Sequence, residues 1–320
     1  MSSLTAFLKS NLSLPYRQVA SSLLNKYIVT KSGIGLHKDR CLAIRYPEVG
    51  DYGLVGTAFD YALRTRLSLR KGKIIKKEDT VAYSSYKLVK DIQLDYVPYD
   101  TLLSRTILSI LKEFERIQED ALKNLDQSGI SGNLLLTLLG SCLKLARIDS
   151  IYRGRAGELK DFDITYTQDH LEDMLYLWCN TEIDFFSAHQ KEKLNPVIGS
   201  FGHAISCSDG DLILDNKMID IKTVKYKKDL EYIMQSLSYL IMYNCKFLLK
   251  IETYDMPKDI FQFKNLTSFI QYVTGNDKLL SEVGIYYSRH AEYTYIDLDN
   301  IPDKEAYQLY TSFIECANGI

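Results

Sequence analysis

Residues 210–223 read GDLILDNKMIDIKT, two short apolar runs with a polar break between them. Alternation with a period of two is typical of strands, and a short break rich in turn residues between two such runs indicates a β-hairpin. We therefore predict two strands joined by a tight turn, with Asn216 and Lys217 at its tip. The position of the tip fixes the register, and the register decides which side chains share a face.

The predicted register gathers charged side chains on one face of the hairpin. It sets Asp211 opposite Lys222 and Ile213 opposite Asp220. Because successive side chains of a strand point to opposite faces, Asp211, Asp220 and Lys222 all project from the same side. A slip of one residue would send Asp211 to the apolar face. That other face carries Leu212, Leu214, Ile219 and Ile221.

Two carboxylates and an ammonium group above an apolar face are typical of a metal-dependent phosphodiesterase site. Carboxylates bind divalent cations, and an ammonium group stabilises negative charge on a phosphate. The alternative is structural, because Asp and Lys also line the solvated face of many hairpins. The hairpin alone leaves these two interpretations balanced.

A second signal lies on the helix predicted at 229–243. Gln235-Ser-Leu-Ser-Tyr239 places an amide and a phenol one turn apart on the same helix face. Such a pair can hold a phosphate or brace a catalytic strand. For the helix alone a core stripe of Tyr232, Tyr239 and Tyr243 is the simpler interpretation, and the hairpin upstream shifts the balance toward function.

The composition is that of a globular protein of 320 residues, with 46% hydrophobic and 25% charged residues and a formal net charge of -2. This balance excludes a strongly basic coat for nucleic acid, so any such contact must be a local patch. The six cysteines lie far apart without a CxxC pair, which argues for free thiols and against a zinc or iron-sulfur site. No stretch reaches the roughly 20 apolar residues of a membrane span, and we expect a cytoplasmic location.

The first half of the sequence is predicted to be mainly helical. Apolar residues spaced three and four apart indicate amphipathic helices. The predicted helices span 2–10, 15–27, 54–69, 101–125 and 134–148, with a short strand at 41–45. A break at Arg153-Gly-Arg-Ala-Gly157 leads us to predict a mainly helical region at 1–165 and a second domain at 166–320.

The second half alternates helices and strands, which is the order of an α/β fold. Helices are predicted at 168–189, 229–243 and 303–314. Strands are predicted at 197–207, 211–214, 218–223, 246–251, 283–288 and 292–298.

The order of the polar residues resembles the PD-(D/E)XK nuclease superfamily. The pattern is Asp211, then Asp220-Ile-Lys222, then Gln235-Ser-Leu-Ser-Tyr239 on the next helix. The QxxxY element makes the chain similar to the RecB-type and Cas4-type branch, although the usual proline beside the first acid and the iron-sulfur cysteines are missing. The resemblance implies a restriction-endonuclease-like α-β-β-β-α-β core sheet flanked by helices.

The resemblance also implies Mg²⁺-dependent hydrolysis of nucleic-acid phosphodiesters, with DNA favoured over RNA. Asp211 and Asp220 would bind Mg²⁺ or Mn²⁺, helped by the main-chain carbonyl of Ile221. Lys222 would hold the attacking water or stabilise the added negative charge. The Gln and Tyr of the QxxxY element would steady the site and the nucleic-acid backbone. Domains of this kind recur in defence, repair and mobile-element biology.

RecB-type members also carry an upstream acid or histidine on a helix, and three residues are open for that role. Asp60 ends the segment Gly56-Thr-Ala-Phe-Asp60, while Glu172 and Glu182 lie on the helix before the first strand. For any one of them a structural role on a helix surface is the simpler interpretation. The same holds for His203, which is predicted to lie in the first strand.

Two basic runs, 64–77 and 222–228, suggest phosphate contacts, with a solvated lysine-rich surface as the alternative. Two other functions compete with a nuclease. One is a nuclease-like fold kept as a catalytically weak nucleic-acid-binding or interaction module, and the other is a helical scaffold with an incidental hairpin. In the scaffold, Asp211 and Asp220 could lie more than about 8 Å apart, too far to share one metal ion.

Overall fold

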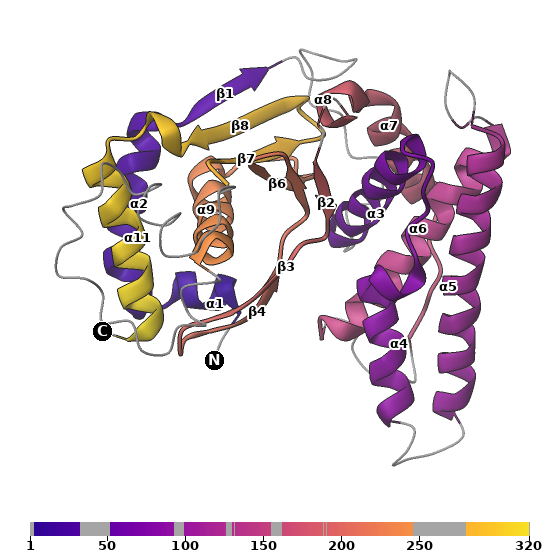
Figure 1. Cartoon of the computed structure of the whole chain (residues 1–320). Coiled ribbons are helices and arrows are strands. Elements are labelled where there is room, and N and C mark those ends of the chain that lie inside the picture. Colours follow the sequence, from indigo (N-terminus) through magenta and orange to yellow (C-terminus); the bar gives the residue numbers. More distant parts are fainter. Residues whose placement is uncertain are drawn as a thin grey trace.

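The computed structural model has an α/β fold in which helices cover both faces of a mixed six-stranded sheet (Figure 1). It describes residues 3–32, 52–92, 99–125, 130, 132–154, 162–187, 189, 191–245 and 280–319. The predicted α/β class and the mainly helical first half are confirmed. Within the described ranges, no helix is long and apolar enough to cross a membrane.

The main sheet has the strand order β1-β8-β7-β6-β5-β2. Strands β6 and β7 run parallel, and the other neighbouring pairs run antiparallel. A parallel pair needs a crossover connection, and the helix α9 (Asp229–Cys245) lies between these two strands in the sequence. The six strands are β1 (Val29–Ser32), β2 (Glu192–Leu194), β5 (Leu212–Leu214), β6 (Lys217–Lys222), β7 (Glu282–Tyr287) and β8 (Glu292–Asp297).

One face of the sheet packs against helices from the middle of the chain (Figure 1). Their apolar side chains share a core with Leu212, Leu214 and Ile219 of the sheet. These elements are α3 (Tyr52–Arg70), the 3₁₀ helix η2 (Lys77–Asp79), α4 (Val81–Ile92), α5 (Tyr99–Lys123), α6 (Gly132–Tyr152), α7 (Gln168–Asn180) and α8 (Ile183–Ser187). The sequence did not predict α4, and the strand predicted at 41–45 lies outside the described residues.

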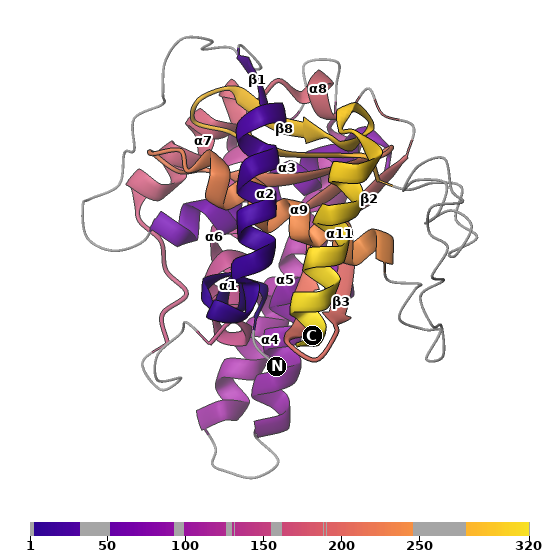
Figure 2. The same cartoon turned by 90° about the vertical axis from the view of Figure 1, so that its left-hand side faces the viewer.

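The opposite face packs against α9 and helices from both ends of the chain, and α2 and α11 lie side by side there (Figure 2). The rings of Phe7 and Tyr16 meet that of Phe313 edge to face, with centroids 6.0 and 4.9 Å apart. These terminal elements are α1 (Leu4–Lys9), η1 (Asn11–Ser13), α2 (Leu14–Tyr27), η6 (Leu298–Asn300) and α11 (Asp303–Asn318). Strand β1, which was not predicted, pairs with β8, so residues 3–32 pack with the second half of the chain. The boundary at 165/166 stays a prediction.

The predicted helix 168–189 is interrupted. Helix α7 ends at Asn180, whose side-chain amide donates to the main-chain oxygen of Ser288 at 3.2 Å. Thr181 then takes an extended backbone, and α8 starts at Ile183. A contact with a distant turn therefore ends the helix where the local pattern would continue it.

The single strand predicted at 197–207 is instead a small separate hairpin of β3 (Val197–Phe201) and β4 (Ile205–Asp209). Gly202 turns the chain with φ of 57°, and a Cβ atom there would lie 2.5 Å from the Ala317 carbonyl oxygen. His203 lies in this turn and is exposed, so its predicted place in a strand is wrong. The strand predicted at 246–251 falls outside the described part of the chain.

The central hairpin turns one residue earlier than predicted, at Asp215 and Asn216. Ile213 pairs with Met218, so its predicted position opposite Asp220 is wrong. Asp215 has φ of 52°, and a tight hairpin turn needs such left-handed backbone, which Asp and Asn tolerate better than Lys. The local turn preference of Asp215 therefore sets the register.

The new register moves each partner by two positions and keeps each side chain on its predicted face. Beyond the last ladder pair, Leu212 with Ile219, it sets Asp211 opposite Asp220, so the predicted pairing of Asp211 with Lys222 is wrong. The apolar residues of both strands still share the core under α3. A shift of the strand pairing by one position, in place of two, would have moved the side chains of one strand to the opposite face of the sheet.

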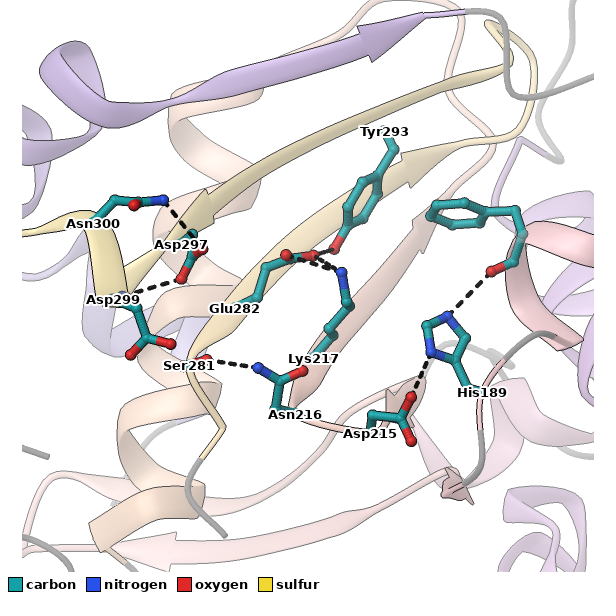
Figure 3. A network of polar contacts seen from close by, with 11 residues as sticks. His189, Asp215, Asn216, Lys217, Ser281, Glu282, Tyr293, Asp297, Asp299 and Asn300 are labelled. Carbon is teal, nitrogen blue, oxygen red and sulfur yellow. Dashed lines mark hydrogen bonds and ion pairs between the residues drawn. The ribbon is translucent and has the colours of Figure 1, made fainter.

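A polar network fixes the hairpin tip (Figure 3). Asp215 Oδ1 accepts a hydrogen bond from Lys191 N at 2.9 Å, and Asn216 Nδ2 donates to Ser281 Oγ at 2.7 Å. Lys217 Nζ donates to both carboxylate oxygens of Glu282 at 3.0 Å. These contacts fix the start of β6. Asp220 and Lys222 lie toward its other end, where the candidate site is located.

The described cysteine side chains are free thiols, as predicted. Cys142, Cys245 and Cys316 are buried, and Cys179 is exposed. Burial raises the pKa of Cys142 and of Cys245 to about 12, which keeps both thiols protonated at neutral pH.

Candidate active site

Asp211 lies directly before β5 and is joined to β6 through its side chain. Its Oδ2 atom accepts a hydrogen bond from the main-chain amide of Ile221 at 2.7 Å. In an extended strand the N–H and C=O of one residue point to the same edge, so the Ile221 carbonyl also faces the Asp211 side of β6. The predicted ligand oxygens of Asp211 and Ile221 are therefore neighbours.

Asp220 and Lys222 project from β6 toward α9 as an ion pair. Lys222 Nζ lies 2.5 Å from Asp220 Oδ2 and 5.4 Å from the centroid of the Tyr232 ring on α9. Burial raises the pKa of Asp220 to about 7, and Asp211 adds to the shift through its charge and a hydrogen bond, while Lys222 opposes it. Burial lowers the pKa of the Lys222 ammonium group, but the charges of Asp220 and Asp211 have a larger combined effect, so this pKa is raised above its ordinary value.

Asp211 raises the pKa of Asp220 through a hydrogen bond as well as through its charge, so the two carboxyl groups are neighbours. A hydrogen bond between two carboxyl groups requires a proton on one of them, because two carboxylates only accept. The wide separation expected of an incidental hairpin is therefore not observed. A divalent cation and a shared proton are alternative ways to neutralise such a pair.

Asp60 on α3 joins these acids from the helical side of the sheet. Helix α3 approaches the end of β6 closely at Gly56, where a Cβ atom would lie 2.8 Å from Thr223 Oγ1. Asp60 follows one turn later and is ion-paired with Arg64. Burial raises the pKa of Asp60 to about 7, Arg64 opposes the shift, and the nearby charge of Asp211 adds to it.

The other two acids considered for the upstream position have different neighbours. Glu172 Oε1 accepts a hydrogen bond from Gln168 on its own helix at 3.4 Å. The charge of Glu182 acts on Arg66 and Tyr286. Among the described residues, Asp60 is therefore the one of the three acids whose pKa is raised by the charge of Asp211.

Gln235 and Tyr239 face the same acids from α9. Gln235 Nε2 donates to Tyr239 Oη at 3.0 Å, so the amide and phenol act as one unit. Burial raises the pKa of Tyr239 to about 12, and the charge of Asp220 adds to the shift. Tyr232, Tyr239 and Tyr243 also pack against the core as a partly buried stripe, so the structural interpretation of this helix face holds as well.

The basic run 64–77 is largely used inside the fold. Arg64 pairs with Asp60, Arg66 donates to the Trp178 carbonyl at 2.9 Å, and Lys77 pairs with Glu115 at 3.3 Å. In the run 222–228, Lys227 pairs with Glu292, whereas Tyr226 is 73% exposed beneath Lys225. Lys222 and Lys228 in this run form further ion pairs, with Asp220 and Glu231, so the phosphate contact suggested for the two runs stays a prediction.

The sequence did not predict a group of charged residues beside these acids. Arg153, at the end of α6, donates from Nε to the buried Asp149 at 2.9 Å, and its Nη2 lies 3.8 Å from Asp209 Oδ2. Its charge lowers the pKa of Asp60, against the larger effect of burial. Asp149 and Arg153 are four residues apart on a helix, a pattern too common to mark a site by itself.

Carboxylates outnumber cations in the site. Asp60, Asp149, Asp209, Asp211 and Asp220 face Arg64, Arg153 and Lys222. Among the described residues, the buried Asp60 Oδ1 has no hydrogen-bond partner, whereas Asp220 Oδ2 is held by Lys222 Nζ at 2.5 Å. Hard oxygens in excess of nearby positive charge fit Mg²⁺ or Mn²⁺. In the described ranges, no group of three or more His, Cys, Asp or Glu is arranged to hold a metal ion, so the fit rests on two carboxylates and the Ile221 carbonyl.

Replacing Asp211 by Asn is expected to stabilise the metal-free protein above about pH 7. Asp60 and Asp220 have pKa values of about 7 in the fold, so between about pH 4 and pH 7 the folded state holds protons that the unfolded state has released, and stability falls through this window. The substitution removes a charge that adds to both shifts, while the oxygen of the new amide can still accept from the Ile221 N–H. We expect a gain of roughly 1 kcal/mol at pH 8 in the free energy of unfolding.

Urea unfolding of wild type and Asp211→Asn in chelator, at pH 6 and pH 8, measures this effect. The partly exposed Asp120 on α5, changed to Asn, serves as the control and should show no such pH dependence. A less stable Asp211→Asn at both pH values would contradict the described repulsion.

Comparison of the chain with protein-family models, curated proteins and solved structures found no match.

Proposed function

We propose that this protein is a metal-dependent nuclease that hydrolyses phosphodiester bonds of nucleic acid, with DNA as the favoured substrate. The observation that carries the proposal is the meeting of Asp60, Asp211 and Asp220 with Lys222 at the end of β6. Asp211, Asp220 and Lys222 share one hairpin, and the packing of α3 brings Asp60 to them. In this proposal the sheet and α9 form a restriction-endonuclease-like core of the PD-(D/E)XK type.

Asp211, Asp220 and the Ile221 carbonyl would hold one Mg²⁺ or Mn²⁺ ion. When bound, such an ion lowers the pKa of a coordinated water and neutralises phosphate charge. Asp60, whose charge is coupled to that of Asp211, would support this metal ligand from the opposite side, in line with the upstream acid of the RecB-type pattern. Excess carboxylate charge makes the site repel a phosphate until a cation is bound, which links substrate binding to the metal.

Lys222 and the Gln235–Tyr239 pair on α9 would interact with the phosphate. The Lys222 ammonium, held by Asp220, is positioned to stabilise negative charge added to the phosphate during attack. Gln235 Nε2 donates to Tyr239 Oη and so fixes the phenol near Asp220. Tyr239 stays protonated at neutral pH because burial raises its pKa, so its hydroxyl can donate to a phosphate oxygen.

Digestion of nucleic acid by the purified protein tests the proposal. Circular and linear duplex DNA, single-stranded DNA and RNA would each be incubated with Mg²⁺, Mn²⁺ or chelator. We expect cutting of DNA in either metal and none in chelator. Binding without cutting would instead identify a catalytically weak nucleic-acid-binding module, and neither binding nor cutting in any metal would overturn the proposal.

The same assay shows which of the three candidate acids takes the upstream position. Asp60→Asn should lower the cutting rate about 10- to 100-fold, because the acid that supports the proposed metal ligand Asp211 is lost. Glu172→Gln and Glu182→Gln are matched controls of the same chemistry and should cut at the wild-type rate. Loss of activity in one of the controls but not in Asp60→Asn would move the role to that residue. A cytoplasmic location and a role in defence, repair or mobile-element biology remain part of the proposal.

A further inference from the structure

Arg153 brings a guanidinium group from the helical layer to the acids of the sheet. Its Nε donates to Asp149 Oδ1 at 2.9 Å, and the Asp149 side chain is 2% exposed. The contact of Nη2 with Asp209 on β4 is looser, at 3.8 Å. A buried carboxylate thus fixes one edge of the guanidinium and leaves the other edge turned toward the site.

The three cations of the site differ in how far they reach solvent. The side chains of Arg64 and Lys222 are 5% and 22% exposed, and each forms a close ion pair with Asp60 or Asp220. The Arg153 side chain is 37% exposed. Its charge nevertheless acts on Asp60, which places it near the proposed metal ligands. Arg153 is therefore the cation of this group best placed to meet an incoming anion.

We propose that Arg153 binds a backbone phosphate of the nucleic acid on the helical side of the active site. A guanidinium held at Nε keeps two N–H groups in a planar fork, which matches the oxygens of a phosphodiester. Asp149 orients the fork, and the loose Asp209 contact can be exchanged for a phosphate oxygen. Arg153 would act there as a positioning residue, since phosphate contacts set the register of the substrate without reading its sequence.

This inference rests on the proposed nuclease function, and nucleic-acid binding tests it apart from catalysis. The affinity of labelled duplex and single-stranded oligonucleotides would be measured by fluorescence anisotropy between about 50 and 200 mM KCl. Ca²⁺ replaces Mg²⁺ in this assay, and cutting rates in Mg²⁺ are followed in parallel. The variants are Arg153→Ala, Arg153→Gln and Arg153→Lys.

Arg116 on α5 offers a matched control. It forms an ion pair with Asp120 four residues away, as Arg153 does with Asp149, but its side chain is 64% exposed on the helical layer. Arg116→Ala removes the same chemical group and the same kind of helix pair. It should bind nucleic acid as the wild type does.

Arg153→Ala and Arg153→Gln are expected to bind about tenfold more weakly and to show a salt dependence shallower by about one phosphate contact. Arg153→Lys should recover the salt dependence because it keeps the charge. If Arg153→Ala does not fold, Arg153→Gln decides, since its length and hydrogen bonding are closer to arginine. A purely structural ion pair would not change the salt dependence.

Two failures have different meanings. Wild-type protein that binds and cuts, with Arg153 variants of unchanged affinity or unchanged salt dependence, would overturn the role of Arg153 alone. Wild-type protein that neither binds nor cuts would overturn the nuclease function and the phosphate site with it.

Discussion

Replacing Lys222 by Met is expected to lower the rate of DNA cleavage in Mg²⁺ about 100-fold or more, because the site loses the cation that stabilises charge on the phosphate. Methionine fills much of the lysine stem's volume and stays in contact with the Tyr232 ring. Asp211 and Asp220 are unchanged, so the proposed metal ligands remain. Initial rates of plasmid cutting measure the effect, and the thermal unfolding midpoint shows whether the fold is kept.

Lys217 provides a control within the same strand. It starts β6, pairs with Glu282 at 3.0 Å, and lies at the opposite end from Lys222. Lys217→Met breaks a comparable ion pair and should change the cutting rate by no more than about threefold, less than 1 kcal/mol in activation free energy. Equal losses in both variants would mean that β6 needs its ion pairs for folding, and equal activities would remove Lys222 from the mechanism.

Asp173→Asn is expected to destabilise the fold by about 3–5 kcal/mol, because it leaves a buried Arg289 charge without its partner. Both side chains of this pair are fully buried, and Arg289 Nη1 donates to Asp173 Oδ1 at 2.8 Å. Arg289 Nε also donates to the Thr223 carbonyl at 2.9 Å, directly after Lys222. The pair therefore ties α7 to the end of β6, and urea unfolding measures its contribution.

Two comparisons separate loss of the pair from other effects. Asp120→Asn removes a partly exposed partner of Arg116 and should cost no more than about 1 kcal/mol. The double replacement Asp173→Leu with Arg289→Met removes both buried charges and should recover most of the lost stability. Asp173→Asn with wild-type stability, or a double variant less stable than the single one, would contradict the assigned role.

Much of the second half of the chain followed from local patterns. The helices at 229–243 and 303–314 and the strands at 283–288 and 292–298 correspond to α9, α11, β7 and β8. The predicted hairpin faces held although the tip was misplaced, because the error moved each partner by two positions and the side-chain period is two. The predicted helix beyond Asn180 failed because its end is set by a contact with Ser288, far away in the sequence.

The residues of the candidate site also differ in whether the sequence alone could identify them. Asp211, Asp220, Lys222, Gln235 and Tyr239 were recognisable from spacing, since they lie within one hairpin and the next helix. Asp60 could be named only as one of three acids, because its approach to Asp211 depends on the packing of Gly56 against Thr223. Asp149, Arg153 and Asp209 gave no local signal, since an acid and an arginine four residues apart occur on many helix surfaces.

Local sequence patterns were enough to predict the period of most elements, the faces of the hairpin and the types of residue available for chemistry. These properties depend on neighbours a few residues apart, so the order of side chains carries them. Packing between distant segments determined that α3 brings Asp60 to β6. It also placed Arg64 and Lys222 in close ion pairs and left Arg153 more exposed. Burial, more than spacing, gives Asp60 and Asp220 their raised pKa values, and burial exists only once the helical layer and the sheet have come together.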